Sequence, residues 1–408
     1  MTPIRVAVIA DFLEEGWPSM DLVADMLMDR LRAEHGGEIA PVLIRPALKS
    51  RASRLPVGGM FAVDRFMNRL WDYPRAMRKL RDRFDVFHVV DHSYAQLVHA
   101  LLGARTLVTC HDLDTFRSVL EPMAEPRSWP FRAMSSHILA GLRKAGHVAC
   151  DTAATRDALV GKAGLDPDRT SIVLNGPHPS CSPGAEPSAD VEAARLLGPA
   201  GRSTDLLHVG STIARKRIDL LLEVFAAVRR EHPDVRLVRV GGPFTADQRS
   251  LARALGIEHM IVVLPFLDRS TLASVYRHSA LVLLPSDREG FGLPVLEALA
   301  CGAPVVASDI DALREVGGSA AEYCAPDDVP AWIAAVSRAL AERRDDPDRW
   351  RARRKAGIER AASFSWSRYT GDVVALYRQL GGSGTAGGPT AATPAGGGVT
   401  PGVAGHTS

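Results

Sequence analysis

The stretch "ALVLLPSDREGFGLPVLEALACGAPVVASD", residues 280–309, decides the expected fold. Its first six residues are a short apolar run of the kind that forms a buried strand. Pro294 suits the first position of a helix, good helix formers continue to Cys301, and Gly302 and Pro304 predict its end. "PVVAS" then predicts the next strand. A strand, a glycine-containing loop, a helix and a second strand in this order indicate an α/β fold with a parallel sheet.

Two glutamates in this stretch, Glu289 and Glu297, lie eight positions apart. We place Glu297 in the first turn of the helix, where side chains lean towards the N-terminus, so that both carboxylates face one ligand. Free N–H groups near Gly292 and Leu293 at the helix N-terminus attract phosphate. The two carboxylates would then accept hydrogen bonds from hydroxyls on either side of the phosphates, as a nucleotide sugar provides them. The simpler alternative is that Glu289 caps a loop and Glu297 complements the helix dipole.

Short apolar runs alternate with helical patterns along both halves of the chain, which predicts two Rossmann-like, doubly wound domains facing across a cleft. Ligands of such sheets bind at the carboxyl ends of the strands. The expected strands are "IRVAVIA", "PVLI", "FDVFHVV", "RTLVTC", "HVAC" and "SIVLN" in the first half, and "DLLHVG", "VRLVRVGG", "MIVVLP", "ALVLLP", "PVVAS" and "AEYCA" in the second.

A segment rich in proline, glycine and serine near residue 180 predicts the boundary between the domains. We expect an N-terminal domain over residues 1–180, a second domain over 181–363 and a closing helix over 364–380. The remaining residues, 381–408, contain ten glycines and no Lys, Arg, Asp or Glu, so we expect a disordered tail.

Other candidate site residues also follow expected strands. Gly210 ends a strand, and Arg215 and Lys216 stand near the start of the next helix, where two cations can neutralise a diphosphate without a metal. A solvated pair of surface cations is the alternative. His111, followed by Asp112, ends a strand of the first domain and is expected on the opposite wall of the cleft, unless it is a structural histidine. We find no cluster of His, Asp and Glu with metal-ligand spacing and expect no bound metal.

The overall composition is that of a globular protein long enough for two cores. Of 408 residues, 24% are charged and 46% hydrophobic, and the net charge of +2 gives no indication of nucleic acid binding. The five cysteines are widely spaced and form no C-x-x-C pair, so we expect reduced thiols. No signal peptide or membrane span is evident, and we expect a cytoplasmic protein.

One segment departs from this balance. Residues 45–83 hold eleven Lys or Arg against three Asp, and residues 60–84 interleave these cations with Phe, Leu, Trp and Met. A helix lying on an anionic membrane has this pattern. The alternative is an ordinary surface helix that packs its apolar stripe on the sheet, and Pro74 is expected to break the helix in either case.

Taken together, the motifs resemble those of the retaining glycosyltransferases of family 4, which have the GT-B fold. The resemblance covers Ile4 to Leu380 and is most specific in "EGFGLPVLEALACGAPVVASD", which is similar to the family's signature of two glutamates separated by seven residues. "HVGSTIARKRID", "HDL", "NGPHP" and "LREVGG" also fit.

By this resemblance, Glu289 and His111 are the expected catalytic residues, with Glu289 at the transferred sugar. Glu297 would contact the ribose, Arg215 and Lys216 the diphosphate, and the backbone of Gly290, Phe291, Gly292 and Leu293 the sugar and phosphates. Many relatives have an arginine directly after the glycine that matches Gly210, whereas this chain has Ser211 there, and Arg215 is the residue that can replace that charge.

The implied function is retaining, metal-independent transfer of a hexosyl group. The donor would be a nucleoside diphosphate sugar and the acceptor a hydroxyl of a glycan, lipid or small molecule, with no other cofactor. Two alternatives remain open from the sequence. One is a sugar-nucleotide 2-epimerase, which needs no acceptor, and the other is a catalytically silent GT-B scaffold that binds nucleotide sugar or glycan.

Overall fold

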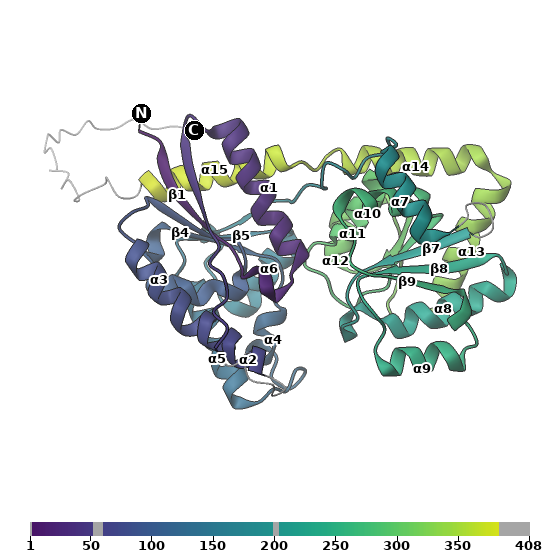
Figure 1. Ribbon diagram of the computed structural model, residues 1–408, viewed down its shortest axis with the longest axis horizontal. Coiled ribbons are helices and arrows are strands. Elements are labelled where there is room, and N and C mark those ends of the chain that lie inside the picture. The colour runs from purple at the N-terminus through teal and green to yellow at the C-terminus, as the bar shows by residue number, and fades with distance from the viewer. Residues whose placement is uncertain (1, 52–59, 199–203, 383–408) are drawn as a thin grey trace, which may run out of the picture.

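The computed structural model describes residues 2–51, 60–198 and 204–382, which form two parallel β-sheets flanked by helices (Figure 1). This arrangement confirms the expected α/β architecture with two Rossmann-like domains. The predicted tail begins two residues too early, because Gly381 and Gly382 end the last helix. Residues 383–408, to which the prediction of disorder applies, lie outside the described residues.

The first sheet has the strand order β2-β1-β3-β4-β5-β6, and its strand pairs are parallel. All six runs predicted from the first half of the sequence are strands, although the last is shorter than its apolar run. The strands are β1 (Ile4–Ile9), β2 (Ile39–Ile44), β3 (Val86–Val89), β4 (Thr106–Cys110), β5 (His147–Cys150) and β6 (Thr170–Ile172).

The second sheet has the order β12-β11-β10-β7-β8-β9 and is also parallel. The six runs predicted from the second half are confirmed as well. The strands are β7 (Thr204–Val209), β8 (Val235–Val240), β9 (Ile261–Leu264), β10 (Leu281–Leu284), β11 (Val305–Ser308) and β12 (Glu322–Cys324).

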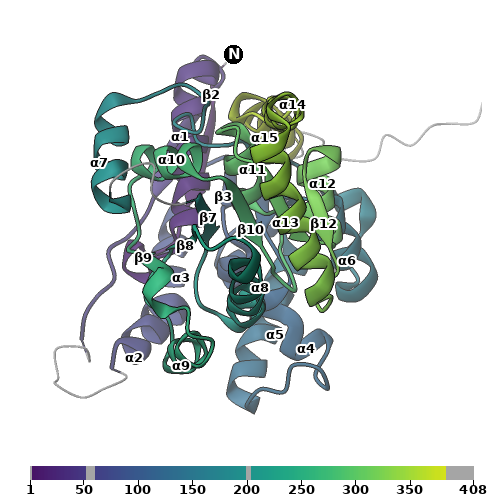
Figure 2. The ribbon, with the colours of Figure 1, turned by 90° about the vertical axis from the view of Figure 1, so that its right-hand side faces the viewer.

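Helices connect successive strands in both domains (Figures 1 and 2). Short helical turns are named η in the text. The first domain contains η1 (Leu13–Glu15), α1 (Pro18–His35), α2 (Met60–Met67), η3 (Asn68–Asp72), α3 (Tyr73–Leu80), η4 (His92–Ala100), η5 (Gly103–Arg105), η6 (Asp114–Phe116), α4 (Arg117–Leu120), α5 (Trp129–Lys144), α6 (Ala153–Ala163) and η7 (Pro167–Arg169). The second part of the chain contains α7 (Pro187–Leu197), η8 (Ala214–Lys216), α8 (Ile218–Glu231), α9 (Ala246–Ala254), η9 (Glu258–Met260), α10 (Arg269–His278), α11 (Leu293–Ala300), α12 (Asp311–Gly317), η10 (Gly318–Ala320), α13 (Val329–Asp345), α14 (Pro347–Ala361) and α15 (Trp366–Gly382).

Each sheet is covered on both faces. In β1, Ala7 and Ile9 join the core formed with α3, η4 and α5, whereas Val6 and Val8 join the core formed with α1 and α15. Strands buried on both faces need apolar side chains at nearly every position, which is why they were recognisable as continuous apolar runs. All five cysteines are buried free thiols, as expected for packing residues. Among the described helices, none is both long and apolar enough to cross a bilayer.

The closing helix α15 follows the second domain in sequence but packs on the first (Figure 1). It lies against α1 and the strands of the first sheet, where the Tyr377 hydroxyl is 2.7 Å from Nδ1 of buried His88. At its start, the indole N–H of Trp366 donates to the Pro177 carbonyl at 3.0 Å. This bond joins the two places where the chain crosses between the domains.

The basic segment differs from its prediction in two ways. Helical backbone continues from Met60 to Leu80, so Pro74 does not break it: a π-helical turn, η3, precedes the proline and loosens the hydrogen-bond pattern that proline would disrupt. The inward face of α2 and of the start of η3 is polar, because Asp64 and Asn68 are buried. The alternative in which the apolar stripe packs on the sheet is therefore wrong for α2 and η3, and that stripe is exposed.

Candidate active site

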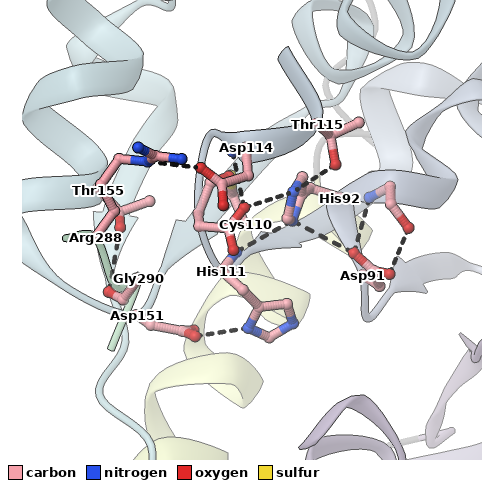
Figure 3. Close-up of polar contacts among 12 residues, drawn as sticks. Asp91, His92, Cys110, His111, Asp114, Thr115, Asp151, Thr155, Arg288 and Gly290 are labelled. Atoms are coloured by element: carbon pink, nitrogen blue, oxygen red, sulfur yellow. Dashed lines mark hydrogen bonds and ion pairs between the residues drawn. The ribbon is translucent and has the colours of Figure 1, made fainter. Parts of the chain in front are cut away.

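The loop between β10 and α11 lies so close to the first domain that only glycine fits at position 290. A Cβ atom at Gly290 would lie 1.7 Å from the His111 carbonyl oxygen at the end of β4. The Gly290 carbonyl also accepts hydrogen bonds from the hydroxyls of Thr152 at 2.8 Å and Thr155 at 3.3 Å, at the start of α6 (Figure 3). Gly292 takes a φ of 97°, which favours glycine, and caps α11. These glycines seat the signature loop at the domain interface.

Glu289 lies at the centre of a cationic cluster formed by that loop and η8. Its Oε1 is 2.5 Å from Nζ of Lys216, its Oε2 is 3.2 Å from Nη1 of Arg215, and Ser286 donates to Oε1 at 2.7 Å. The Glu289 side chain is only 7% exposed. Burial opposes its ionisation, but Lys216 and Arg215 outweigh burial and hold the pKa of Glu289 below its ordinary value.

Arg215 connects this cluster to the first domain through ion pairs with two aspartates. Its Nε is 3.0 Å from Oδ2 of Asp114 and its Nη2 is 3.9 Å from Oδ2 of Asp112, both in the segment after β4. Nε of Arg288 lies 3.3 Å from the other Asp114 oxygen (Figure 3). Asp112 and Asp114 form an Asp-x-Asp pair, a pattern that binds divalent cations in many proteins and that our sequence analysis overlooked. In the structure, Arg215 pairs with both carboxylates and Arg288 with Asp114.

His111 lies at the interface but its ring faces into the first domain. Nδ1 is 2.6 Å from Oδ2 of Asp151, and Nε2 is 2.7 Å from the Val90 carbonyl oxygen (Figure 3). Burial lowers the pKa of His111, but the Asp151 carboxylate more than compensates and raises it to about 9. Because both ring nitrogens are already bonded to protein groups, the ring has no free group for a substrate. In this arrangement, the backbone of His111 reaches the second domain and its side chain does not.

Glu297 has a different environment from Glu289. Our placement of Glu297 in the first turn of α11 is wrong: the helix begins at Leu293, so Glu297 is its fifth residue. Its buried carboxylate accepts a hydrogen bond from the Tyr276 hydroxyl at 3.0 Å, and Nη1 of Arg269 is 3.9 Å away. Burial is the main influence and raises the pKa of Glu297. The two glutamates share none of these partners.

The remaining predicted residues, Gly210, Phe291 and Leu293, lie near the cluster in sequence but do not line the cavity described below. Gly210 directly follows β7, and its N–H donates to the Val240 carbonyl at 2.9 Å. The Phe291 side chain is buried and packs edge to face on Phe364, with ring centroids 6.1 Å apart. Leu293 packs where the cores of the two domains meet. The side chains of Phe291 and Leu293 thus pack in the protein core, and the expected backbone role of the loop stays a prediction.

A cavity of about 220 Å³ opens between the domains beside this cluster. Its charged lining comes from both domains, and pockets for drug-sized ligands are usually larger, about 300 Å³ or more. A complete nucleotide sugar would therefore require the loops or domains to separate slightly. The charged lining residues are Asp112, Asp114, Arg117, Glu121, Lys162, Arg215, Asp287, Arg288, Glu289 and Asp311.

Sequence reasoning missed several residues of this site. Asp114 and Arg288 join the two walls, and Asp151 orients His111. Asp114 follows "HDL" directly, so the strand-end motif itself was the available signal, whereas the pairing of Asp151 with His111 has no signature in a single sequence. Within the described residues, no group of three or more His, Cys, Asp or Glu side chains is placed to hold a metal ion.

Comparisons with known proteins agree with this architecture. Residues 29–180 match the profile "Glycosyltransferase Family 4", and residues 195–359 match "Glycosyl transferases group 1". A D-inositol 3-phosphate glycosyltransferase 1 of Catenulispora acidiphila is 31% identical over 328 residues, covering 76% of this chain and 75% of that protein. A D-inositol 3-phosphate glycosyltransferase of Kineococcus radiotolerans is 33% identical over 255 residues, covering 58% of this chain but only 57% of that protein.

Solved structures share the fold at low sequence identity. Sucrose-phosphate synthase from Thermosynechococcus elongatus superposes with a TM-score of 0.72 at 21% identity, covering 93% of this chain and all of that one. The Anabaena protein HepE, in complex with UDP and glucose, superposes with a TM-score of 0.68 at 16% identity, covering 92% of this chain and all of that one.

Proposed function

The chain belongs to glycosyltransferase family 4, and on that premise we propose that it is a retaining, metal-independent hexosyltransferase. It would move a hexosyl group from a nucleoside diphosphate sugar to a hydroxyl of a glycan, lipid or small molecule. The observation that carries the proposal is the convergence of Lys216 and Arg215 on Glu289 beside the interdomain cavity. Fold stability alone does not require this set of buried charges at one cleft.

The cationic cluster would receive the charged part of the donor. Lys216 and Arg215 can neutralise a diphosphate and the charge that develops on it as a leaving group, which is the role of a metal in other transferases. Glu289, kept ionised by these cations, is an acceptor for hydrogen bonds from hydroxyls of the transferred sugar. A ligand would therefore exchange partners with groups that are already paired, rather than bring new charge into an apolar site.

On the first domain, we propose that His111 acts as a fixed cation behind the acceptor site. Its bonds to Asp151 and the Val90 carbonyl hold the ring in place. Asp112 and Asp114, which pair with Arg215, stand closer to the cavity and would be released when the diphosphate binds that arginine. Because the named relatives carry D-inositol 3-phosphate in their titles, that compound is the first small acceptor to test.

The first experiment is thermal stabilisation of the protein, without added metal, by UDP-, GDP-, ADP- and dTDP-sugars. We expect a shift of several degrees with one donor class. Transfer from that donor is then measured with candidate acceptors, and the anomeric configuration of the product tests retention. A product formed without acceptor would favour the 2-epimerase alternative. Donor binding without turnover on any acceptor would favour the silent scaffold.

We also propose that the first domain contacts anionic membrane through the exposed stripe of α2 and η3. Phe66 and Trp71 are 53% and 57% exposed, and the other exposed apolar members of the stripe are Phe61, Val63 and Met67. Arg65, Arg75, Arg78 and Lys79 of the same helical segment are also exposed, and the Arg75 guanidinium lies 4.5 Å from the centre of the Trp71 ring. An outward apolar face among cations has the chemistry of an interfacial helix. Both views place α2 at the lower end of the first domain, with α4 and α5 (Figures 1 and 2).

Sedimentation with vesicles tests this contact. Vesicles containing phosphatidylglycerol should retain the protein at low salt and less of it at physiological salt, because salt screens the cations. Phe66→Ser combined with Trp71→Ser should abolish retention. Val191→Ser, at another exposed apolar residue on α7, is the control and should leave it unchanged. No retention of the unmodified protein at either salt concentration would rule out the contact.

A further inference from the structure

Arg239, near the carboxyl end of β8, is an arginine buried inside a parallel sheet. Its side chain is fully buried, and in the strand register it stands directly beside His208 of β7. No carboxylate of the described chain lies within ion-pair distance of its guanidinium, and burial alone lowers the pKa of Arg239 to about 10. Buried charges in proteins are normally paired, because leaving water costs several kcal/mol per ion, roughly, unless a counter-charge compensates. This cation therefore calls for an explanation.

The hydrogen bonds of Arg239 all go to two glycine turns. Nη2 donates to the Gly210 carbonyl at 2.8 Å and to the Gly241 carbonyl at 3.4 Å, and Nη1 donates to the Gly242 carbonyl. These turns follow β7, which leads into η8 with Arg215 and Lys216, and its neighbour β8. They also touch one another, since a Cβ at Gly241 would lie 2.1 Å from the Gly210 carbonyl oxygen, and Gly241 has a φ of 125°. One guanidinium thus fixes both turns.

The surroundings of Arg239 are cationic or neutral. His208, whose ring nitrogens have no hydrogen-bond partner, is buried, and burial together with Arg239 and Lys216 pushes the pKa of His208 well below its ordinary value. Lys216 packs close to the same turn, 3.6 Å from a Cβ placed at Gly210, but its charge is paired with Glu289. The positive charge of Arg239 is therefore not balanced by a carboxylate of the described chain. An anion bound at the two turns would balance it.

We propose that Arg239 is a positioning residue for the diphosphate of the donor. It holds the turns after β7 and β8 in place and supplies the positive charge that Glu289 does not neutralise. This inference rests on the proposed function, since it assumes a nucleoside diphosphate at the cleft. It assigns Arg239 no contact with the reacting atoms. It predicts that binding of the phosphates depends on Arg239, whereas binding of the nucleoside does not.

Isothermal titration with UDP, GDP and ADP, and with uridine, guanosine and adenosine, separates the two parts of the ligand. Arg239→Met should bind the preferred diphosphate about 10- to 100-fold more weakly, as expected for the loss of one charged partner. Its affinity for the matching nucleoside should be unchanged. Arg236→Met is the matched control, because Arg236 lies on the same strand and pairs with Asp205 at 2.8 Å, and it should bind both ligands normally.

Arg239→Gln guards against misfolding, because glutamine can still donate to the turn carbonyls while it removes the charge. It too should lose affinity for the diphosphate selectively. Normal diphosphate binding by either Arg239 variant would overturn the inference, and so would an equal loss of nucleoside binding, which indicates only a folding role. If the unmodified protein binds none of the three diphosphates, the proposed function fails and this inference fails with it.

Discussion

The two glutamates of the signature stretch lie in contrasting parts of one motif. Around Glu289, in the loop, Lys216 and Arg215 lie within 3.2 Å and hold the pKa of the carboxyl below its ordinary value. Around Glu297, in α11, the nearest partner is a neutral phenol and burial raises the pKa. The same residue type, eight positions away, is thus held charged in one region and shifted towards the neutral form in the other. Spacing in the sequence identifies the pair, and the neighbours decide the chemistry of each member.

The largest effect is expected when each of the two carboxylates is replaced in turn by a neutral amide. Glu289→Gln should reduce transfer by about 1,000-fold, because the sugar loses a charged acceptor and two cations lose their counter-ion. Glu297→Gln, the matched control, should reduce it by about 10-fold, since a neutral amide resembles the protonated acid. The rate constant for transfer is measured with the donor found by thermal stabilisation, after circular dichroism shows that both variants are folded. Equal losses in the two variants would remove the distinction.

A smaller effect is expected from the cation that holds Glu289 ionised. Lys216→Met should raise the KM for the donor by about 10- to 100-fold, the range for one charged hydrogen bond. Lys355→Met on α14, where the lysine is 78% exposed and remote from the cluster, is the control and should leave KM unchanged. Steady-state kinetics with varied donor checks both. A KM equal to that of the unmodified enzyme would mean that Lys216 pairs with Glu289 without binding the diphosphate.

Stability against pH should move in opposite directions for the two glutamates. The lowered pKa of Glu289 stabilises the fold above its unfolded-state pKa, and that stability is lost as pH falls through the folded pKa. The raised pKa of Glu297 costs stability above its folded pKa, and the cost disappears on acidification. At pH 7.5, Glu289→Gln should therefore lower the melting temperature by about 2–4 °C and Glu297→Gln should raise it slightly. Both differences should shrink towards pH 4. Shifts of the same sign would contradict the assignment.

The smallest effect concerns the first domain, where Asp151 raises the pKa of His111 to about 9. The stability that this pair contributes is complete below the ordinary histidine pKa of about 6.5 and is lost as pH rises through about 9. Asp151→Asn should remove that loss, so the melting temperature of the variant should fall less, by about 1–3 °C, between pH 6.5 and 10. Differential scanning fluorimetry across this range is the measurement. Parallel curves for the two proteins would show that His111 is neutral.

The fold was predictable because its signal is local. The central strands, such as β4, β10 and β11, are buried on both faces and are therefore continuous apolar runs, and glycine with proline marks the ends of helices such as α11. The second-domain wall of the site was predictable for the same reason, since Glu289, Arg215 and Lys216 each follow a strand closely. Their roles remain predictions, but the structure does bring them together.

What could not be predicted depends on contacts between distant residues. The ring of His111 turns away from the cleft because Asp151, forty positions later, binds it. In "VRLVRV" the two arginines are three positions apart and so lie on opposite faces of the strand, and nothing in the sequence distinguishes the buried Arg239 from the half-buried Arg236. The sequence left open whether the apolar residues of α2 pack inward or face outward, because amphipathic periodicity identifies two faces without showing which one packs.

The bond between Trp366 and the Pro177 carbonyl has a mechanical consequence. The chain crosses between the domains twice, and this contact fastens the two crossings side by side. A Cβ at Gly176 would lie only 2.6 Å from the Trp366 backbone nitrogen, so the crossings touch through their backbones. Two connections held together in this way form a hinge. They allow the domains to rotate about the contact and resist twisting of one domain against the other. Arg215 and Asp114, which meet across the interface, should therefore separate and return along one repeatable path each time the domains open.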